Sequence, residues 1–478
     1  MKKFFEKHDL VKFVGIIFAV SILFTWIFTS LSYFNGSELA TEEMTRVGLF
    51  DLVNFVPSLT IQVFRDTFIF LFVVAGFYKL LGTIEAYKKV TTNLANIFKG
   101  KEKIFVAIST LLFAVLASMV TDYIVLIAIV PFFISVLSKL KVDRITGLSA
   151  TFGGILVGVV GATYSTKIVG SFVSVYGSNG VDYLYEPMGL ILLLVIAYLL
   201  LTLFTFLRMN KVSKNKEVKL LEDPFASAEE TKTGKKVVRK IKSIPMIIVL
   251  VLTFLVVIMS FIGWESVFNV KFFSDIYNSI IEATVGNSTI FYSLLGVAKF
   301  TAFGNWDALN IATTLLIATL IIKIIYRIPM DRVLSEYGEG IKKFGKTAFV
   351  ILLVYGVLVI SLSYPVIPEM ISWILEKGTN IGTIFISGIL GSLFGVDFYY
   401  YLSLVSGAFT DFSNINVACL ALQGAYGFIS FIAPTSVILM LGLSMLDIKY
   451  TDWLKHIWKF ALSLLVVIIV ILAIIMYI

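Results

Sequence analysis

Long apolar runs recur along the chain and are separated by shorter polar segments. A helix needs about 20 apolar residues to cross a bilayer core of ~30 Å. The pattern therefore predicts an all-α integral membrane protein with about 9–10 transmembrane helices. We expect the apolar-rich stretch 49–64, within an acidic segment, to lie along the membrane surface. The clearest spanning runs cover residues 13–31, 67–81, 188–207, 245–262, 311–325, 347–363 and 460–478.

Composition supports a membrane protein and argues against a nucleic-acid partner. The 478 residues are 58% hydrophobic and only 15% charged, whereas soluble domains are typically ~25% charged. The formal net charge of +8 comes from Lys and Arg at the ends of apolar runs, as is usual for cytoplasmic loops. The N-terminus and residues 208–242, which hold eleven Lys or Arg against five Asp or Glu, are therefore predicted to be cytoplasmic. The C-terminus is predicted to be external.

Two of the long apolar runs are interrupted near their middle by polar residues. Residues 104–137 are interrupted at 118–122 and have basic flanks, whereas residues 381–409 are interrupted at 392–397 and have acidic flanks. Non-helical backbone at membrane depth is tolerated only where it lines protein or water. We therefore expect two re-entrant hairpins, the first based on the cytoplasmic side and the second on the external side.

Each hairpin is followed by an interrupted helix, at residues 145–175 and 414–446. Equal order with opposite orientation predicts two inverted structural repeats, a common plan of secondary transporters. The spacing from the acidic residue of the hairpin to the threonine of the helix break is 41 residues in one half and 38 in the other. The predicted organisation is an N-terminal repeat at 1–207, a basic linker at 208–242 and a C-terminal repeat at 243–478, with an extra helix at 245–262 and a final helix at 460–478.

The four interruptions carry the polar groups that a transport site needs. A helix interrupted inside a membrane exposes N–H groups, which attract anions, and carbonyl groups, which can coordinate Na⁺. Hydroxyl groups both donate and accept hydrogen bonds. The candidate substrate- and ion-binding residues are Ser118, Thr121, Asp122, Thr163, Ser165, Thr166, Lys167, Ser392, Asp397, Thr435 and Ser436.

Three of these candidates carry charge at the predicted depth of the membrane. Because insertion costs ~2.5–3.5 kcal/mol per charge, a functional role is the first hypothesis. We assign Asp122 and Asp397 to Na⁺ or proton coupling, and Lys167 to an anionic group of the substrate. The alternatives are a structural ion pair between Asp122 and Lys167, or a Lys167 side chain that extends to the membrane surface.

One segment near the C-terminus carries a family resemblance, in Ile432–Met440 together with Gly442, Leu446, Tyr450 and Trp453-Leu454-Lys455. It resembles the C4-dicarboxylate and basic amino acid carriers of the ion transporter superfamily and, more distantly, the aminobenzoyl-glutamate transporters.

The resemblance implies a homodimeric carrier whose substrate site lies between two inward-pointing hairpin tips and two broken helices. It would place Thr435 and Ser436 at the second broken helix, and Thr163 and Ser165 at the first. The tips here are less rich in Ser, Gly and Asn than those of the related carriers, which leaves the substrate and the coupling ion open.

These observations predict a secondary active transporter of a small organic anion or amino acid in the plasma (inner) membrane. Transport would be driven by Na⁺, H⁺ or exchange, through an elevator-like or other alternating-access motion at the hairpin tips. The chain has no P-loop or dinucleotide-binding glycine pattern, so we expect no cofactor besides a coupling ion.

Two other classes of membrane protein fit the sequence less well than a carrier does. A multispan membrane enzyme, such as a lipid-linked glycan transferase or polymerase, usually needs catalytic groups in a large external loop. The largest external region, 265–307, contains no His and no Arg. A channel would need a continuous polar stripe, whereas the polar residues here gather at four separate interruptions.

Overall fold

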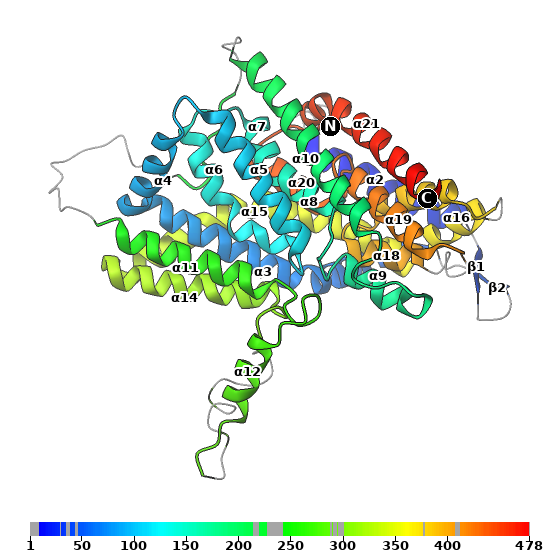
Figure 1. Ribbon diagram of the computed structural model, residues 1–478, viewed down its shortest axis with the longest axis horizontal. Coiled ribbons are helices and arrows are strands. Elements are labelled where there is room, and N and C mark those ends of the chain that lie inside the picture. The colour runs from blue at the N-terminus through cyan, green and yellow to red at the C-terminus, as the bar shows by residue number, and fades with distance from the viewer. Residues whose placement is uncertain are drawn as a thin grey trace.

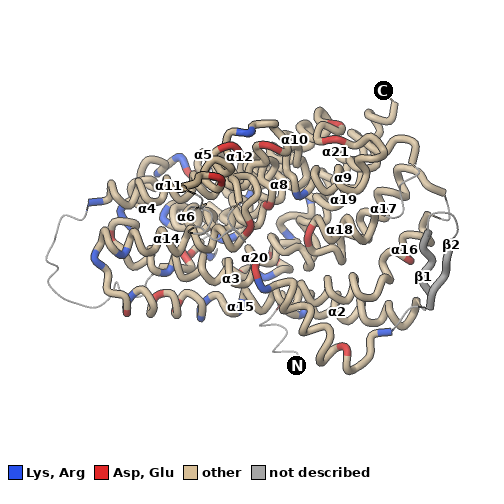
Figure 2. The backbone as a smooth tube through the Cα atoms, turned by 90° about the horizontal axis from the view of Figure 1, so that it is seen from below, with Lys and Arg blue, Asp and Glu red and all other residues tan. Residues whose placement is uncertain are grey.

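The computed structural model describes residues 9–28, 30–34, 39–43, 46–213, 219–226, 242–286, 289, 294, 301–375, 378–406 and 412–477. They form an elongated bundle of helices (Figure 1). The predicted all-α membrane class is confirmed, because seven of the described helices are long and apolar enough to cross a membrane: Asp9–Ile27, Asp51–Thr83, Glu102–Met119, Pro187–Val212, Ala308–Tyr326, Met330–Ser363 and Tyr450–Tyr477. Charged residues are sparse along the bundle (Figure 2).

The first half of the chain runs from α2 to α10. Its elements are α2 (Asp9–Ile27), β1 (Ser30–Phe34), β2 (Leu39–Glu43), η1 (Asp51–Phe55), α3 (Val56–Thr83), α4 (Glu85–Ile97), α5 (Glu102–Met119), η2 (Tyr123–Ala128), α6 (Val130–Lys139), α7 (Arg144–Leu148), η3 (Ser149–Gly153), α8 (Gly154–Val160), α9 (Val169–Tyr176), η4 (Gly177–Asn179) and α10 (Pro187–Val212).

The second half runs from α11 to α21. Its elements are α11 (Ile244–Ser260), α12 (Phe272–Glu282), α14 (Ala308–Tyr326), α15 (Met330–Ser363), α16 (Val366–Leu375), α17 (Ile381–Phe394), α18 (Phe398–Val405), α19 (Ile415–Ser430), α20 (Val437–Met445) and α21 (Tyr450–Tyr477). Helix α12 projects from the bundle within the predicted external region (Figure 1). Residues 287–288, 290–293 and 295–300 of that region lie outside the described residues.

A pair of long helices, α3 and α15, forms the scaffold at one side of the bundle. They pack along each other, and α2 and α14 pack against the same pair. The two backbones approach closely at Gly340, where an added Cβ atom would lie only 2.5 Å from the carbonyl oxygen of Ala75. Further along the pair, the rings of Phe64 and Tyr355 lie 5.2 Å apart.

Residues 49–64 are not a separate element, and their place relative to the membrane surface stays a prediction. This stretch forms the first turns of the helix that continues to Thr83. Its side chains at Val56, Thr60 and Phe64 repeat every four residues and are buried, so one face of this extension packs against the bundle. The acidic segment before it contains the short antiparallel pair β1–β2, which the apolar pattern did not predict.

Part of the predicted linker 208–242 belongs to the packed structure. Helix α10 continues to Val212. Residues 219–226 then fold back onto the bundle, where the N–H of Leu221 donates to the carbonyl of Val142 at 2.8 Å and Phe225 is buried. Residues 214–218 and 227–241 lie outside the described residues.

The interruptions predicted within the apolar runs are present as breaks between helices. The chain leaves helix at 120–122 and at 395–397, and again at 161–168 and 431–436. Phe133 of α6 packs against both Phe105 and Phe113 of α5, and the re-entrant hairpins stay a prediction. The entry of the two hairpins from opposite membrane sides and the inverted repeat stay predictions. Residues 407–409 of the second hairpin lie outside the described residues.

Candidate substrate and ion site

Three charged side chains from three separate breaks meet inside the bundle. The Nζ atom of Lys167 lies 2.9 Å from Asp122 Oδ1 and 2.6 Å from Asp397 Oδ2. All three side chains are shielded, with exposed fractions of 16% for Lys167, 32% for Asp122 and 14% for Asp397. One ammonium group therefore bridges two carboxylates that come from opposite halves of the chain.

Each aspartate is held at the start of a helical segment. Asp122 accepts a hydrogen bond from the N–H of Ile124 at 3.0 Å and caps η2. Asp397 accepts one from the N–H of Tyr399 at 3.0 Å and caps α18. Carboxylates suit these positions because the first N–H groups of a helix have no partner within the helix. The same geometry at both tips fixes the direction in which each carboxylate points.

The tip that carries Asp397 is conformationally unusual. Val396, directly before it, has a φ of 53°, in the left-handed region that β-branched residues rarely adopt. Such conformations cost about 1–3 kcal/mol and persist only where the surroundings impose them. Here Val396 is buried and the Asp397 carboxylate is held both by the capping hydrogen bond and by Lys167.

Lys167 is positioned by the first broken helix, between α8 and α9. The carbonyl of Ser118, at the end of α5, accepts hydrogen bonds from the N–H groups of Thr163 at 3.3 Å and Tyr164 at 3.0 Å. These contacts satisfy N–H groups that the break leaves unpaired. They also fix the segment that presents Lys167 against the end of α5, close to the Asp122 tip.

The first tip is also tied to the neighbouring helix α11. The N–H of Thr121 donates to the carbonyl of Phe261 at 2.5 Å, and Val120 and Ile262 form an antiparallel bridge. These backbone polar groups of the tip are therefore paired with protein, as the low polarity of a membrane interior requires.

Two tyrosines close the space beside the charged residues. The hydroxyl groups of Tyr123 and Tyr426 lie 2.9 Å apart, and Lys167 Nζ lies 5.1 Å from the centre of the Tyr123 ring. A small cavity borders both tyrosines, Asp397 and Ser436, and has a volume of about 10 Å³. That is close to the minimum for one water molecule. In this conformation the space between the tyrosines and Asp397 is too small for a dicarboxylate.

The second broken helix, between α19 and α20, has its carbonyl groups paired by α21. The indole N–H of Trp453 donates to the carbonyl of Phe431 at 2.8 Å, and the hydroxyl of Tyr450 donates to the carbonyl of Ile432. The hydroxyl of Thr435 donates to the carbonyl of Leu393 at 2.8 Å. Thr435 thus joins this break to the tip of the second predicted hairpin.

The remaining predicted hydroxyl residues are more dispersed than the three charges. Ser118, Thr163 and Ser392 donate to carbonyl groups of their own segments, at Val115, Gly161 and Gly388. Thr166 lies against Gly263. The hydroxyl of Ser165 is buried and has no hydrogen-bond partner among the described residues. Only Ser436 borders the small cavity together with Asp397.

Gln423, which is not among the residues predicted from sequence, lies at the contact between the two halves. Its amide nitrogen donates to the carbonyls of Val160 at 3.2 Å and Ala162 at 2.9 Å. Its amide oxygen accepts from the hydroxyl of Tyr185 at 2.5 Å. The side chain is fully buried. An amide in the middle of the apolar run 415–432 was the available signal.

Proteins bind metal ions through ligand sets of acidic, cysteine and histidine side chains. Within the part of the chain that the structure describes, no three His, Cys, Asp or Glu side chains gather to hold a metal ion. A Na⁺ ion at Asp122 or Asp397 would therefore need backbone carbonyl or hydroxyl oxygens as its other ligands, which hard cations accept.

A bundle of apolar helices that encloses charged groups at helix breaks is the architecture of a membrane transporter. The family model described as "C4-dicarboxylate anaerobic carrier" matches residues 16–477. The chain therefore belongs to the C4-dicarboxylate anaerobic carrier family. It is an integral membrane transporter, and the alternative of a membrane enzyme is set aside.

Comparison with individual proteins adds little detail. No curated protein matches the chain. Among solved structures, the YdaH transporter of Alcanivorax borkumensis is 10% identical, with 97% of each chain covered and a TM-score of 0.39. MtrF of Neisseria gonorrhoeae, described as an antimetabolite efflux pump, is 12% identical, with 97% of this chain and 94% of that chain covered and a TM-score of 0.36.

Proposed function

We propose that this transporter is a secondary carrier of small dicarboxylates and that Lys167 binds a substrate carboxylate. The observation that carries the proposal is the position of Lys167 between Asp122 and Asp397. The Lys167 ammonium group already binds two carboxylates of the protein. It can form the same charge-assisted hydrogen bonds with the carboxylates of a dicarboxylate. The name of the family to which the chain belongs supports this substrate class.

The charges of the site also support ion coupling. Two aspartates and one lysine leave an excess of one negative charge, which opposes the entry of a dianion. Binding of H⁺ or Na⁺ at Asp122 or Asp397 would remove that excess and weaken the hold of the carboxylate on Lys167. The cation and the substrate would then bind together, which is the requirement for coupled transport.

The cavity beside Asp397 must widen before a substrate can enter it. The small cavity of about 10 Å³ holds at most one water molecule, far less than a dicarboxylate needs. The tips are tied by a small number of bonds, such as those from Thr435 to Leu393 and from Thr121 to Phe261. We propose that these contacts break in turn, so that the site opens alternately to the two sides of the membrane through an elevator-like or related motion.

Counterflow in proteoliposomes tests the substrate class. Vesicles loaded with an unlabelled C4-dicarboxylate should transiently accumulate the labelled compound, because only a carrier exchanges one for the other. Vesicles loaded with a monocarboxylate of similar size or with a basic amino acid serve as controls. Exchange of a basic amino acid without exchange of any dicarboxylate would contradict the proposal.

A further inference from the structure

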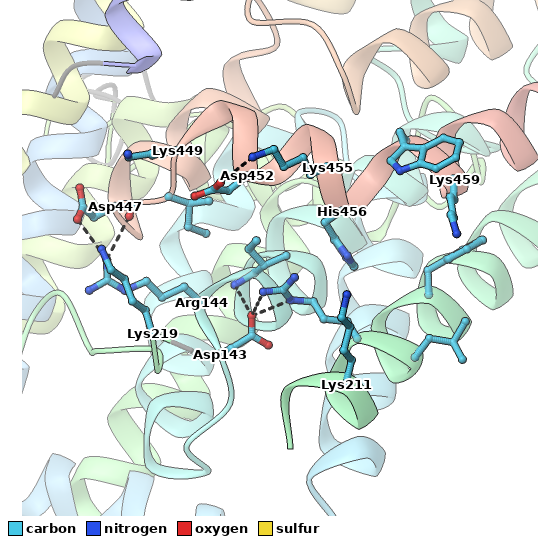
Figure 3. A pocket seen from close by; sticks show the side chains of 16 residues that line it. Asp143, Arg144, Lys211, Lys219, Asp447, Lys449, Asp452, Lys455, His456 and Lys459 are labelled. Carbon is cyan, nitrogen blue, oxygen red and sulfur yellow. Dashed lines mark hydrogen bonds and ion pairs between the residues drawn. The ribbon is translucent and has the colours of Figure 1, made fainter. Parts of the chain in front are cut away.

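A larger cavity lies away from the charged site, between the C-terminal end of α10 and the N-terminal turns of α21 (Figure 3). Its volume is about 720 Å³. Its lining includes seven Lys or Arg residues and three Asp residues. We call it the basic cavity. In Figure 3, Lys211 comes from α10, and Lys455 and Lys459 come from α21, on either side of the same space.

The three aspartates of the basic cavity are already engaged. Arg208 binds Asp143 Oδ2 through Nε at 2.8 Å and through its terminal nitrogen at 2.7 Å. Asp447 accepts from Arg144 at 3.2 Å and lies 3.4 Å from Lys346 Nζ.

The third aspartate, Asp452, lies 4.0 Å from Lys455 on the same helix. Four lysines of the cavity, Lys211, Lys219, Lys449 and Lys459, have no carboxylate partner within ion-pair distance among the described residues. The basic cavity thus presents uncompensated positive charge.

One side of the basic cavity continues into an apolar surface. Leu207 of α10 and Trp458 of α21 line the cavity, and each is about half exposed, at 54% and 53%. Leu203 and Leu462 lie one helical turn further along the two helices and are also exposed. Both helices are long and apolar enough to cross a membrane, so this exposed surface points to the acyl chains of the bilayer.

We propose that the basic cavity binds the phosphate headgroup of an anionic phospholipid, whose acyl chains lie along α10 and α21. Lysines clustered between membrane helices favour such headgroups. A free phosphate ion shares the headgroup chemistry but makes no use of the apolar surface formed by Leu203, Leu207, Trp458 and Leu462. The exposed stripe that begins at the cavity is the feature that distinguishes the lipid from the soluble anion.

Quenching of Trp458 by brominated lipids tests the proposal. The full-length protein is reconstituted in phosphatidylcholine vesicles that contain a fixed minor fraction of brominated phosphatidylglycerol or brominated phosphatidylcholine. The signal of Trp458 is isolated by subtracting that of the Trp458→Phe variant. Each lysine near an anionic headgroup contributes about fivefold in affinity, so we expect at least about a fivefold preference for the anionic lipid.

The lysine variants distinguish the cavity from general surface charge. Replacing Lys211, Lys449 and Lys459 together by Gln should abolish the preference. Replacing the exposed Lys89, Lys99 and Lys101, on and next to α4, removes the same charge elsewhere and should leave it intact. Both variants are checked for an unchanged melting temperature in detergent.

Two results would overturn the proposal. Equal quenching by the two brominated lipids in the wild type would exclude a preferred anionic lipid at this site. The second result is protection of the wild type over the lysine variant, in detergent at constant ionic strength, by inorganic phosphate alone. That result, with no lipid preference in vesicles, would assign the basic cavity to a soluble phosphate-bearing anion.

Discussion

The Nζ atom of Lys167 lies 2.6 Å from Asp397 Oδ2, although 230 residues separate the two along the chain. The same ammonium group lies 2.9 Å from Asp122 Oδ1. Three helix breaks that are distant in sequence thus meet at one ionic contact. A contact that joins both halves is well placed to report the state of the site, because any opening between the halves must lengthen or break it.

Removing the lysine from this contact should destabilise the protein. Lys167→Gln leaves two shielded carboxylates near each other without a cation, and loss of one partner of a buried pair typically costs about 3–5 kcal/mol. We expect a clear drop in the melting temperature of the detergent-solubilised protein. The matched control is Lys342→Gln, whose exposed side chain pairs only loosely with Glu339 at 4.0 Å.

A neutral version of the same site separates folding from transport. The triple variant Asp122→Asn, Lys167→Gln, Asp397→Asn has no unpaired buried charge, so most of the lost stability should return. Dicarboxylate counterflow should nevertheless remain absent, because no cation is left to bind the substrate. Full transport by the neutral variant would show that the three charges are structural only.

Gln423 should matter for stability because it pairs carbonyls that the first broken helix leaves free. Gln423→Leu leaves the carbonyls of Val160 and Ala162 without these partners. An unsatisfied buried polar group costs about 1–3 kcal/mol, so the melting temperature should fall. Gln62→Leu, on an exposed face of α3, is the matched control and should change little. Equal effects of the two substitutions would contradict the bridging role.

The positions of the helix breaks could be predicted from sequence because polar residues are rare within membrane-spanning runs. Polar and charged residues such as Asp122, Lys167 and Asp397 stand out within apolar runs, since few such residues are tolerated there. The apolar runs predicted the positions of the long helices, because a helix that crosses a bilayer must be long and apolar. Pairing between Asp122 and Lys167 was among the alternatives that the sequence left open.

The remaining partners could not be predicted because they depend on how distant segments pack. Nothing in the local pattern links Tyr123 to Tyr426, or Gln423 to the carbonyl of Ala162. Trp453 is fully buried and pairs the carbonyl of Phe431 at the second break, a partner that the local pattern does not indicate. The early start of α3 was not predicted. Overall hydropathy is similar for a helix that packs one face against the bundle and for a helix that lies on a membrane surface.

Docking of residues 219–226 should depend on pH through Asp223. Its carboxylate accepts from the hydroxyl of Ser135 at 2.6 Å and from the N–H of Phe225 at 2.9 Å. Burial raises the pKa of Asp223 above its usual value of 3.8. The folded state therefore binds the proton more tightly than the undocked state does, and docking weakens as pH rises from 3.8 through the raised pKa.

Hydrogen exchange of the peptide that covers 219–226 measures this docking. After correction for the intrinsic exchange rate, protection should be greater at low pH and decline as pH rises through the pKa of Asp223. Asp223→Asn keeps a polar group at the site without the titration, so its protection should not change over the same interval. Protection that increases with pH in the wild type would contradict the assignment.

The most direct test of the central claim is ion-driven uptake of a labelled C4-dicarboxylate by proteoliposomes that contain the Asp397→Asn variant. The substitution keeps the shape of the side chain and removes the charge on which coupling is proposed to depend. We predict normal expression and folding but no uptake driven by a Na⁺ or proton gradient, while Asp275→Asn, on the exposed surface of α12, behaves as wild type. Unchanged gradient-driven uptake by Asp397→Asn would contradict the account.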